Sequence, residues 1–155
     1  MFTSVAIIGR PNVGKSSLFN KLTKSRDAIV SDFPGLTKDR NYGFLNLDDN
    51  KILIIDTGGI VNESDNLKEA ISNQAWSAVE ESSFIILMLD SSENLTKDDL
   101  DILHKLRKLN KDYVIVLNKI DKKTDSLIKE DLQKEGIHSA IEISAEHSKN
   151  LSSLK

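Results

Sequence analysis

The sequence predicts an α/β fold with a doubly wound, mostly parallel sheet of six strands, one antiparallel edge strand, and helices on both faces. Apolar runs of strand length alternate with longer segments of helical spacing, which is typical of parallel strands joined by helices. One early pair of strand-like runs flanks a short polar turn, which indicates a hairpin and an antiparallel neighbour. Polar, glycine-containing stretches follow several apolar runs, as at the ligand-binding edge of such a sheet. We expect residues 1–155 to form a single domain.

The expected strands are short and rich in apolar residues. The first, 3–8, is continuously apolar, as expected for a central parallel strand that is buried on both faces. The hairpin is expected to pair 42–47 with 52–55 around the polar turn Asp48-Asp49-Asn50. The remaining strands are expected at 84–89, 113–117 and 140–143.

The expected helices follow the strands. They lie at 15–23, 66–80, 97–110 and 125–135, and a last, short helix begins at Ser148. Gly136 is suited to close the fourth of them as a C-cap. Residues 24–40 show no periodicity and contain Pro34-Gly35, and a connection of that length in a compact domain is usually functional.

The composition is that of a folded protein, with 39% hydrophobic and 29% charged residues. Its net charge of −3 argues against a dominant electrostatic attraction to nucleic acid or anionic lipid. The absence of cysteine removes disulfide frameworks and thiolate metal sites and fits a reducing compartment, so we expect a cytoplasmic location. The amino-terminal segment reads as a strand rather than a signal peptide, and no apolar run approaches the ~20 residues that span a bilayer.

The stretch directly after the first strand has the form GxxxxGKS, in the strand–loop–helix context of a phosphate-binding loop. Its glycines let the backbone approach an anion, and its N–H groups and the following helix N-terminus attract phosphate oxygens. Lys15 supplies a cation for the outer phosphates and Ser16 a hydroxyl for Mg²⁺. The predicted phosphate-binding residues are Gly9, Arg10, Pro11, Asn12, Val13, Gly14, Lys15, Ser16 and Ser17.

A second motif, Asp56-Thr57-Gly58-Gly59 followed by Ile60, ends the hairpin. We expect these five residues to line the nucleotide site. The Asp56 carboxylate is placed to hold Mg²⁺, and the two glycines let the backbone approach a γ-phosphate. The alternative is a plain strand-to-loop turn.

A third motif, Asn118-Lys119-Ile120-Asp121, predicts the base. Guanine presents two donors on its Watson–Crick edge, and the Asp121 carboxylate has two acceptor oxygens for them, whereas it would repel the lone pair at N1 of adenine. Asn118 can brace the base and the phosphate loop, and the Lys119 stem can lie over the purine. Ser144-Ala145 is a weaker signal, in which the Ala145 N–H could meet the guanine O6. Without the other motifs, the third motif would be an ordinary solvated turn.

Thr37 lies in the 24–40 loop, where its hydroxyl could reach Mg²⁺ and its N–H the γ-phosphate. The alternative is an ordinary loop threonine. The predicted Mg²⁺ ligands are thus Ser16, Thr37 and Asp56, and the residues predicted to act at the reacting phosphate are Lys15, Thr37 and Gly59.

Together these motifs resemble those of the Era/TrmE group of GTPases. The loop 26–40, which contains Asp-Phe-Pro-Gly-Leu-Thr, is similar to the first G domain of the Der (EngA) family, bacterial GTPases with tandem G domains; Tyr42-Gly43 and residues 90–98 share the likeness. The resemblance implies a P-loop NTPase G domain that binds GTP and GDP with Mg²⁺, hydrolyses GTP, and belongs to a longer protein acting in 50S ribosomal subunit assembly. It also implies a second G domain and a KH-like RNA-binding domain outside this sequence, so ribosome binding is not assigned to these residues.

The position after DxxG, where many GTPases have a glutamine that orients water, is Ile60, whose side chain cannot hydrogen-bond water. We therefore expect slow hydrolysis by the chain alone and an added positive charge at the transition state. A partner's arginine is one source. The resemblance implies another, K⁺ held by the side-chain carbonyl of Asn12, although Asn12 could instead only shape the loop.

Two functions stay open at this stage: a GTP hydrolase, and a regulatory GTP/GDP-binding module with negligible hydrolysis that controls attached domains. A P-loop kinase or ATPase is disfavoured by Asn118–Asp121. The charges of Arg10, Arg26, Asp39 and Arg40 are expected to be solvated or loop-ordering, Trp76 to serve packing, and His104, His138 and His147 receive no role.

Overall fold

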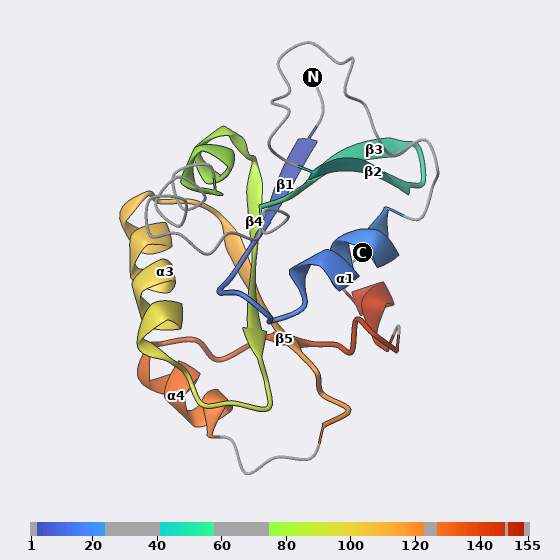
Figure 1. Ribbon diagram of the computed structural model, residues 1–155. Coiled ribbons are helices and arrows are strands. Elements are labelled where there is room, and N and C mark those ends of the chain that lie inside the picture. The colour runs from blue at the N-terminus through green and yellow to red at the C-terminus, as the bar shows by residue number, and fades with distance from the viewer. Residues whose placement is uncertain (1–2, 24–40, 58–74, 123–126, 148, 154–155) are drawn as a thin grey trace, which may run out of the picture.

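The computed structural model describes residues 3–23, 41–57, 75–122, 127–147 and 149–153. Its six strands form one sheet in the order β2-β3-β1-β4-β5-β6 (Figure 1). All neighbouring strands are parallel except the edge strand β2, which is antiparallel to β3. The predicted fold class is confirmed. The strands are β1 Thr3–Ile8, β2 Asn41–Leu47, β3 Asn50–Asp56, β4 Phe84–Asp90, β5 Tyr113–Asn118 and β6 Ile141–Glu142.

The register of the sheet brings the polar ends of distant strands together. Ile7 lies opposite Asp56 across β1 and β3, and Asp90 lies opposite Asn118 across β4 and β5. Because these strands run parallel, their carboxyl ends share one edge of the sheet. In Figure 1 the segments that follow β1 and β5 leave this same edge.

The named helices flank the sheet on two sides (Figure 1): α1 Lys15–Leu22 on one face, and α3 Lys97–Lys108 with α4 Ile128–Lys134 on the other. Residues 75–81 form a further helical segment. A capping box fixes the start of α3, because the Thr96 side chain accepts from the Asp99 N–H while the Asp99 carboxylate accepts from the Thr96 N–H. No helix in the described part of the chain is long and apolar enough to cross a membrane.

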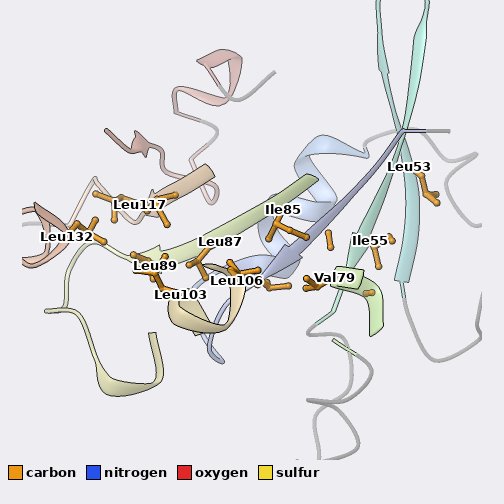
Figure 2. Close-up of a cluster of buried hydrophobic side chains, with 14 of the residues drawn as sticks. Leu53, Ile55, Val79, Ile85, Leu87, Leu89, Leu103, Leu106, Leu117 and Leu132 are labelled. Carbon is orange, nitrogen blue, oxygen red and sulfur yellow. The ribbon is translucent and has the colours of Figure 1, made fainter. Parts of the chain in front are cut away.

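Two apolar clusters cover the faces of the sheet. In β4, alternate residues serve each cluster: Leu87 and Leu89 face α3, whereas Ile86 and Met88 lie in the cluster with α1. Figure 2 shows Leu103 and Leu106 of α3 beside the β4 leucines, and Leu132 of α4 beside Leu117. A shift of β4 by one residue would move each of its side chains to the opposite cluster, so the packing of both clusters fixes the position of its carboxyl end.

The carboxyl-terminal part differs from the expectation. The predicted helix from Ser148 is wrong for the described residues, which form only the 3-10 turn Leu151–Ser153. Ser144 and Lys149 pair backbone to backbone before it, and Asn150 has a φ of 60°, so the chain turns back there. The last strand is also shorter than predicted. The predicted C-cap Gly136 has a φ of 81°, one residue beyond the C-cap Glu135 of α4.

Candidate functional site

The phosphate loop leaves β1 and enters α1 at Gly14, which has a φ of 106°. A Cβ at Gly14 would lie 2.1 Å from the Asn118 side-chain nitrogen, and one at Gly9 would lie 2.7 Å from the Met88 carbonyl oxygen. Both glycines are therefore required by close approach to the neighbouring strands β4 and β5. Val13 is fully buried in the α1-side core and anchors the middle of the loop, whereas Pro11 and Ser17 are exposed.

The Lys15 ammonium group is held inside this loop. Its Nζ donates to the carbonyl oxygens of Gly9 at 2.7 Å and Arg10 at 2.8 Å, and the residue is 8% exposed. Burial lowers the pKa of Lys15, and the Asp56 carboxylate only partly opposes this. A buried cation whose charge the protein compensates poorly is suited to bind an anion supplied by a ligand.

Ser16 and Asp56 form an oxygen pair at the same edge. The Ser16 hydroxyl donates to Asp56 Oδ2 at 3.2 Å, and Asp56 is 1% exposed. Among the described residues no three acidic, histidine or cysteine side chains gather into a metal cage. One carboxylate and one hydroxyl fit Mg²⁺, which is commonly held by few protein oxygens together with phosphate oxygens and water.

Asn118 ties the base motif to the phosphate loop. Its Nδ2 donates to the Val13 carbonyl at 2.8 Å, and its Oδ1 accepts from the Ala145 N–H at 2.9 Å. Three segments far apart in the sequence are thereby joined by one buried amide. Because the Ala145 N–H already donates to Asn118, the guanine O6 contact suggested for it would require this hydrogen bond to be shared.

Lys119 makes a second tie. Its Nζ donates to the Asn12 carbonyl at 2.8 Å and to Asp90 Oδ2 at 2.9 Å. Burial acts to raise the pKa of Asp90, but hydrogen bonds from Ser92 and Lys119 outweigh it and lower the pKa. No role was predicted for Asp90 from the sequence. Its position at the end of an apolar strand, as with Asp56, was the available signal.

Asp121 lies in a pocket at the other end of the phosphate loop. The Ser144 hydroxyl contributes most to lowering the pKa of Asp121, and His147 and Lys149 lower it further. The geometry at Ser144 falls short of a regular hydrogen bond, so its buried Oγ has no full partner among the described residues. His147, which received no role, places its Nε2 3.2 Å from Asp121 Oδ2. The pocket is lined by Gly14, Ser17, Asn118, Lys119, Asp121, Lys122, Ser144 and Glu146.

The remaining predicted residues divide into two groups. Thr57 anchors the end of β3, because its hydroxyl donates to the Ile7 carbonyl at 2.8 Å, and the Ile120 N–H donates to the Ile143 carbonyl at 3.2 Å. Thr37, Gly58, Gly59 and Ile60 lie outside the described residues, as do the loop 24–40 and most of the predicted helix 66–80.

The geometry joins the loop that holds Lys15, an oxygen pair suited to Mg²⁺ and the pocket that contains Asp121 along one edge of the sheet. The sequence matches the family described as "50S ribosome-binding GTPase" over residues 4–119. This chain belongs to that GTPase family.

Relatives of this GTPase chain extend the comparison. GTPase Der of Stenotrophomonas maltophilia is 42% identical over 155 residues, which are 99% of this chain and 33% of the relative. This chain thus spans about a third of the length of this relative, and the predicted resemblance to the Der family is confirmed. Era crystallised with MgGDPNP and a segment of 16S ribosomal RNA is 33% identical, with a TM-score of 0.79, covering 99% of this chain and 54% of Era. A variant of Aquifex aeolicus Era bound to GDP·AlF4⁻ has a TM-score of 0.78 at 31% identity, covering 97% and 54%.

Proposed function

We propose that this chain is a G domain that binds GTP and GDP with Mg²⁺ and hydrolyses GTP to GDP and phosphate. The observation that carries the proposal is the Asn118 amide, which joins the loop holding Lys15 to the pocket holding Asp121. A cation for phosphates and an acceptor pair for guanine are thus held in one rigid arrangement. The same arrangement disfavours an ATP site, because adenine offers no paired donors to Asp121.

In this proposal each group has a defined task. The loop N–H groups and Lys15 bind the outer phosphates and neutralise charge that develops during phosphoryl transfer. Ser16 and Asp56 would hold Mg²⁺, directly or through water, and Thr37 would complete its ligands. When bound, Mg²⁺ would neutralise part of the negative charge of the phosphate oxygens. Asp121 accepts from the guanine N1–H and the exocyclic amine.

The wider role is a further proposal. The relatives named GTPase Der are about three times as long as the match, and the Era structure contains ribosomal RNA. From the family description "50S ribosome-binding GTPase" and the length of these relatives, we infer a part in the assembly of the large ribosomal subunit in the cytoplasm, performed with a second G domain and a KH-like domain in a longer protein. A regulatory module that binds both nucleotides with negligible hydrolysis is the second candidate, and Ile60 is the residue that favours it.

The first test is nucleotide binding and turnover. We expect calorimetry to show GDP binding in the presence of Mg²⁺, and phosphate release from GTP to follow at a slow rate near the ~10⁻⁴ s⁻¹ of unassisted Ras-type enzymes. Lys15→Ala should lose GDP affinity by more than about 100-fold, because a buried charge-assisted contact to phosphate is removed. An unchanged affinity in Lys15→Ala would remove the assignment of this loop. Binding without turnover would favour the regulatory module.

Activation by K⁺ is a separate prediction. Asn12 is exposed at the top of the phosphate loop with a φ of 69°, and its backbone carbonyl is already taken by Lys119. This leaves the side-chain amide oxygen as the group for K⁺. The left-handed backbone supports the alternative, in which Asn12 only shapes the loop. We expect GTP turnover to be faster in KCl than in NaCl at equal ionic strength and Asn12→Ala to abolish the difference. Equal rates in the two salts would leave a partner's arginine as the source of charge.

A further inference from the structure

Arg10 is joined to the start of α3 by two carboxylates. Its Nη2 donates to Glu93, and its Nε lies 3.3 Å from Asp99 Oδ1. Burial acts to lower the pKa of Arg10, but Glu93 and Asp99 outweigh it and raise the pKa. The side chain therefore does not reach into the phosphate pocket as a free charge. It connects the phosphate loop to residues 90–99, which run from the end of β4 into α3 and are called the β4–α3 segment below.

Asp99 depends on this arginine. The side chain of Asp99 is 1% exposed, and that of Arg10 is 18% exposed. One Asp99 oxygen accepts from the Thr96 N–H, whereas the other, together with Arg10 Nε, is buried with no hydrogen-bond partner among the described residues. These two atoms therefore rely on each other electrostatically. A buried carboxylate left without its cation is costly, so this contact restrains both segments.

The main chain of Arg10 links its side-chain contacts to Lys15. Its carbonyl oxygen accepts one of the two hydrogen bonds that hold the Lys15 ammonium. The guanidinium fixes the side chain and the carbonyl fixes Lys15, so a displacement of Arg10 also displaces the cation. The second tie runs parallel to this one, from Asp90 through Lys119 to the Asn12 carbonyl. Both ties begin in the β4–α3 segment.

We propose that Arg10 is a positioning residue, whose contacts with Glu93 and Asp99 hold the phosphate loop and Lys15 ready for the β-phosphate of a guanine nucleotide. The inference rests on the proposed nucleotide binding. It concerns the phosphate end, because Arg10 contacts the Lys15 side of the loop, whereas the pocket around Asp121 keeps its own hydrogen bond from the Ala145 N–H to Asn118. A preorganised loop lowers the cost of ordering on binding, and this gain is specific to ligands that fill the loop.

The test compares GMP with GDP in Mg²⁺ buffer. The dissociation constant of GMP divided by that of GDP measures the contribution of the β-phosphate. We expect Arg10→Ala to lower this ratio about tenfold, with the GMP affinity nearly unchanged, because a largely desolvated ion pair is lost. Arg10→Lys should recover part of the loss, since a lysine keeps the charge but not the planar fork. Glu93→Gln, at an exposed position, should shift the ratio the same way by about twofold to threefold.

Arg107→Ala is the matched control, because Arg107 also joins two segments through Glu135 but lies away from the nucleotide edge. Its ratio should equal that of the wild type. An unchanged ratio in Arg10→Ala would overturn the positioning role. If both affinities fell equally, the role of Arg10 would be a general structural one. If Arg10→Ala does not fold, the ratio in Glu93→Gln decides. A wild-type chain that does not prefer GDP to GMP would instead count against the proposed function.

Discussion

Asn118→Ala is expected to lower the free energy of unfolding by about 2–4 kcal/mol, because the Val13 carbonyl and the Ala145 N–H would each lose their partner. Asn118 is 3% exposed, so water cannot replace the amide freely. The measurement is urea denaturation of the nucleotide-free chain. The m-value, the slope of the unfolding free energy against urea concentration, should stay the same, since the same surface is exposed on unfolding.

The same variant should lose GDP affinity by more than about 100-fold, because the phosphate loop and the base pocket are no longer held in one register. Asn46→Ala on the exposed edge strand β2 is the control and should change the free energy of unfolding by less than about 0.5 kcal/mol. If Asn118→Ala also changed the free energy of unfolding by less than about 0.5 kcal/mol, the two hydrogen bonds of the buried amide would not contribute to stability as expected.

Much of the architecture follows from local patterns in the sequence. The strands are predicted by the apolar runs at β1, β4 and β5 and by the alternating pattern of the β2–β3 hairpin. A strand buried on both faces is continuously apolar, and one buried on a single face alternates. The phosphate loop and the base motif are equally readable. Their meeting at one edge follows from the rule that parallel strands end together, which the registers bear out.

The contacts that tie the site together could not be read in this way. The pairing of Arg10 with Asp99 joins residues far apart in sequence, and nothing local distinguishes Asp99 from the other charged residues of α3. His147 reaches Asp121 only because the chain turns back after Ser144, where the sequence suggested a helix beginning at Ser148. Long-range pairs leave no periodicity in one sequence, whereas strands and motifs do.

Asp121→Asn is expected to exchange the base preference from guanine to xanthine. Asparagine keeps one acceptor for the N1–H but presents a donor where the second oxygen was. Guanine has an amine at that edge and would meet donor with donor, whereas xanthine has a carbonyl and would form both hydrogen bonds. A site whose polar groups pair with one ligand only discriminates by roughly 10⁴, so GDP should weaken by a factor of this order while XDP gains affinity.

The measurement is competition of GDP and XDP for the same chain. Asp49→Asn, the same chemical change in the exposed turn between β2 and β3, should leave both affinities unaltered. Asp121 is also paired with His147, and the variant releases that imidazole, so a small change in stability is expected without loss of the fold. A general weakening of both nucleotides would point to damage of the pocket. Retained guanine preference would show that another group reads the base, and Ser144, whose buried hydroxyl lacks a full partner in the described structure, would be the next residue to replace.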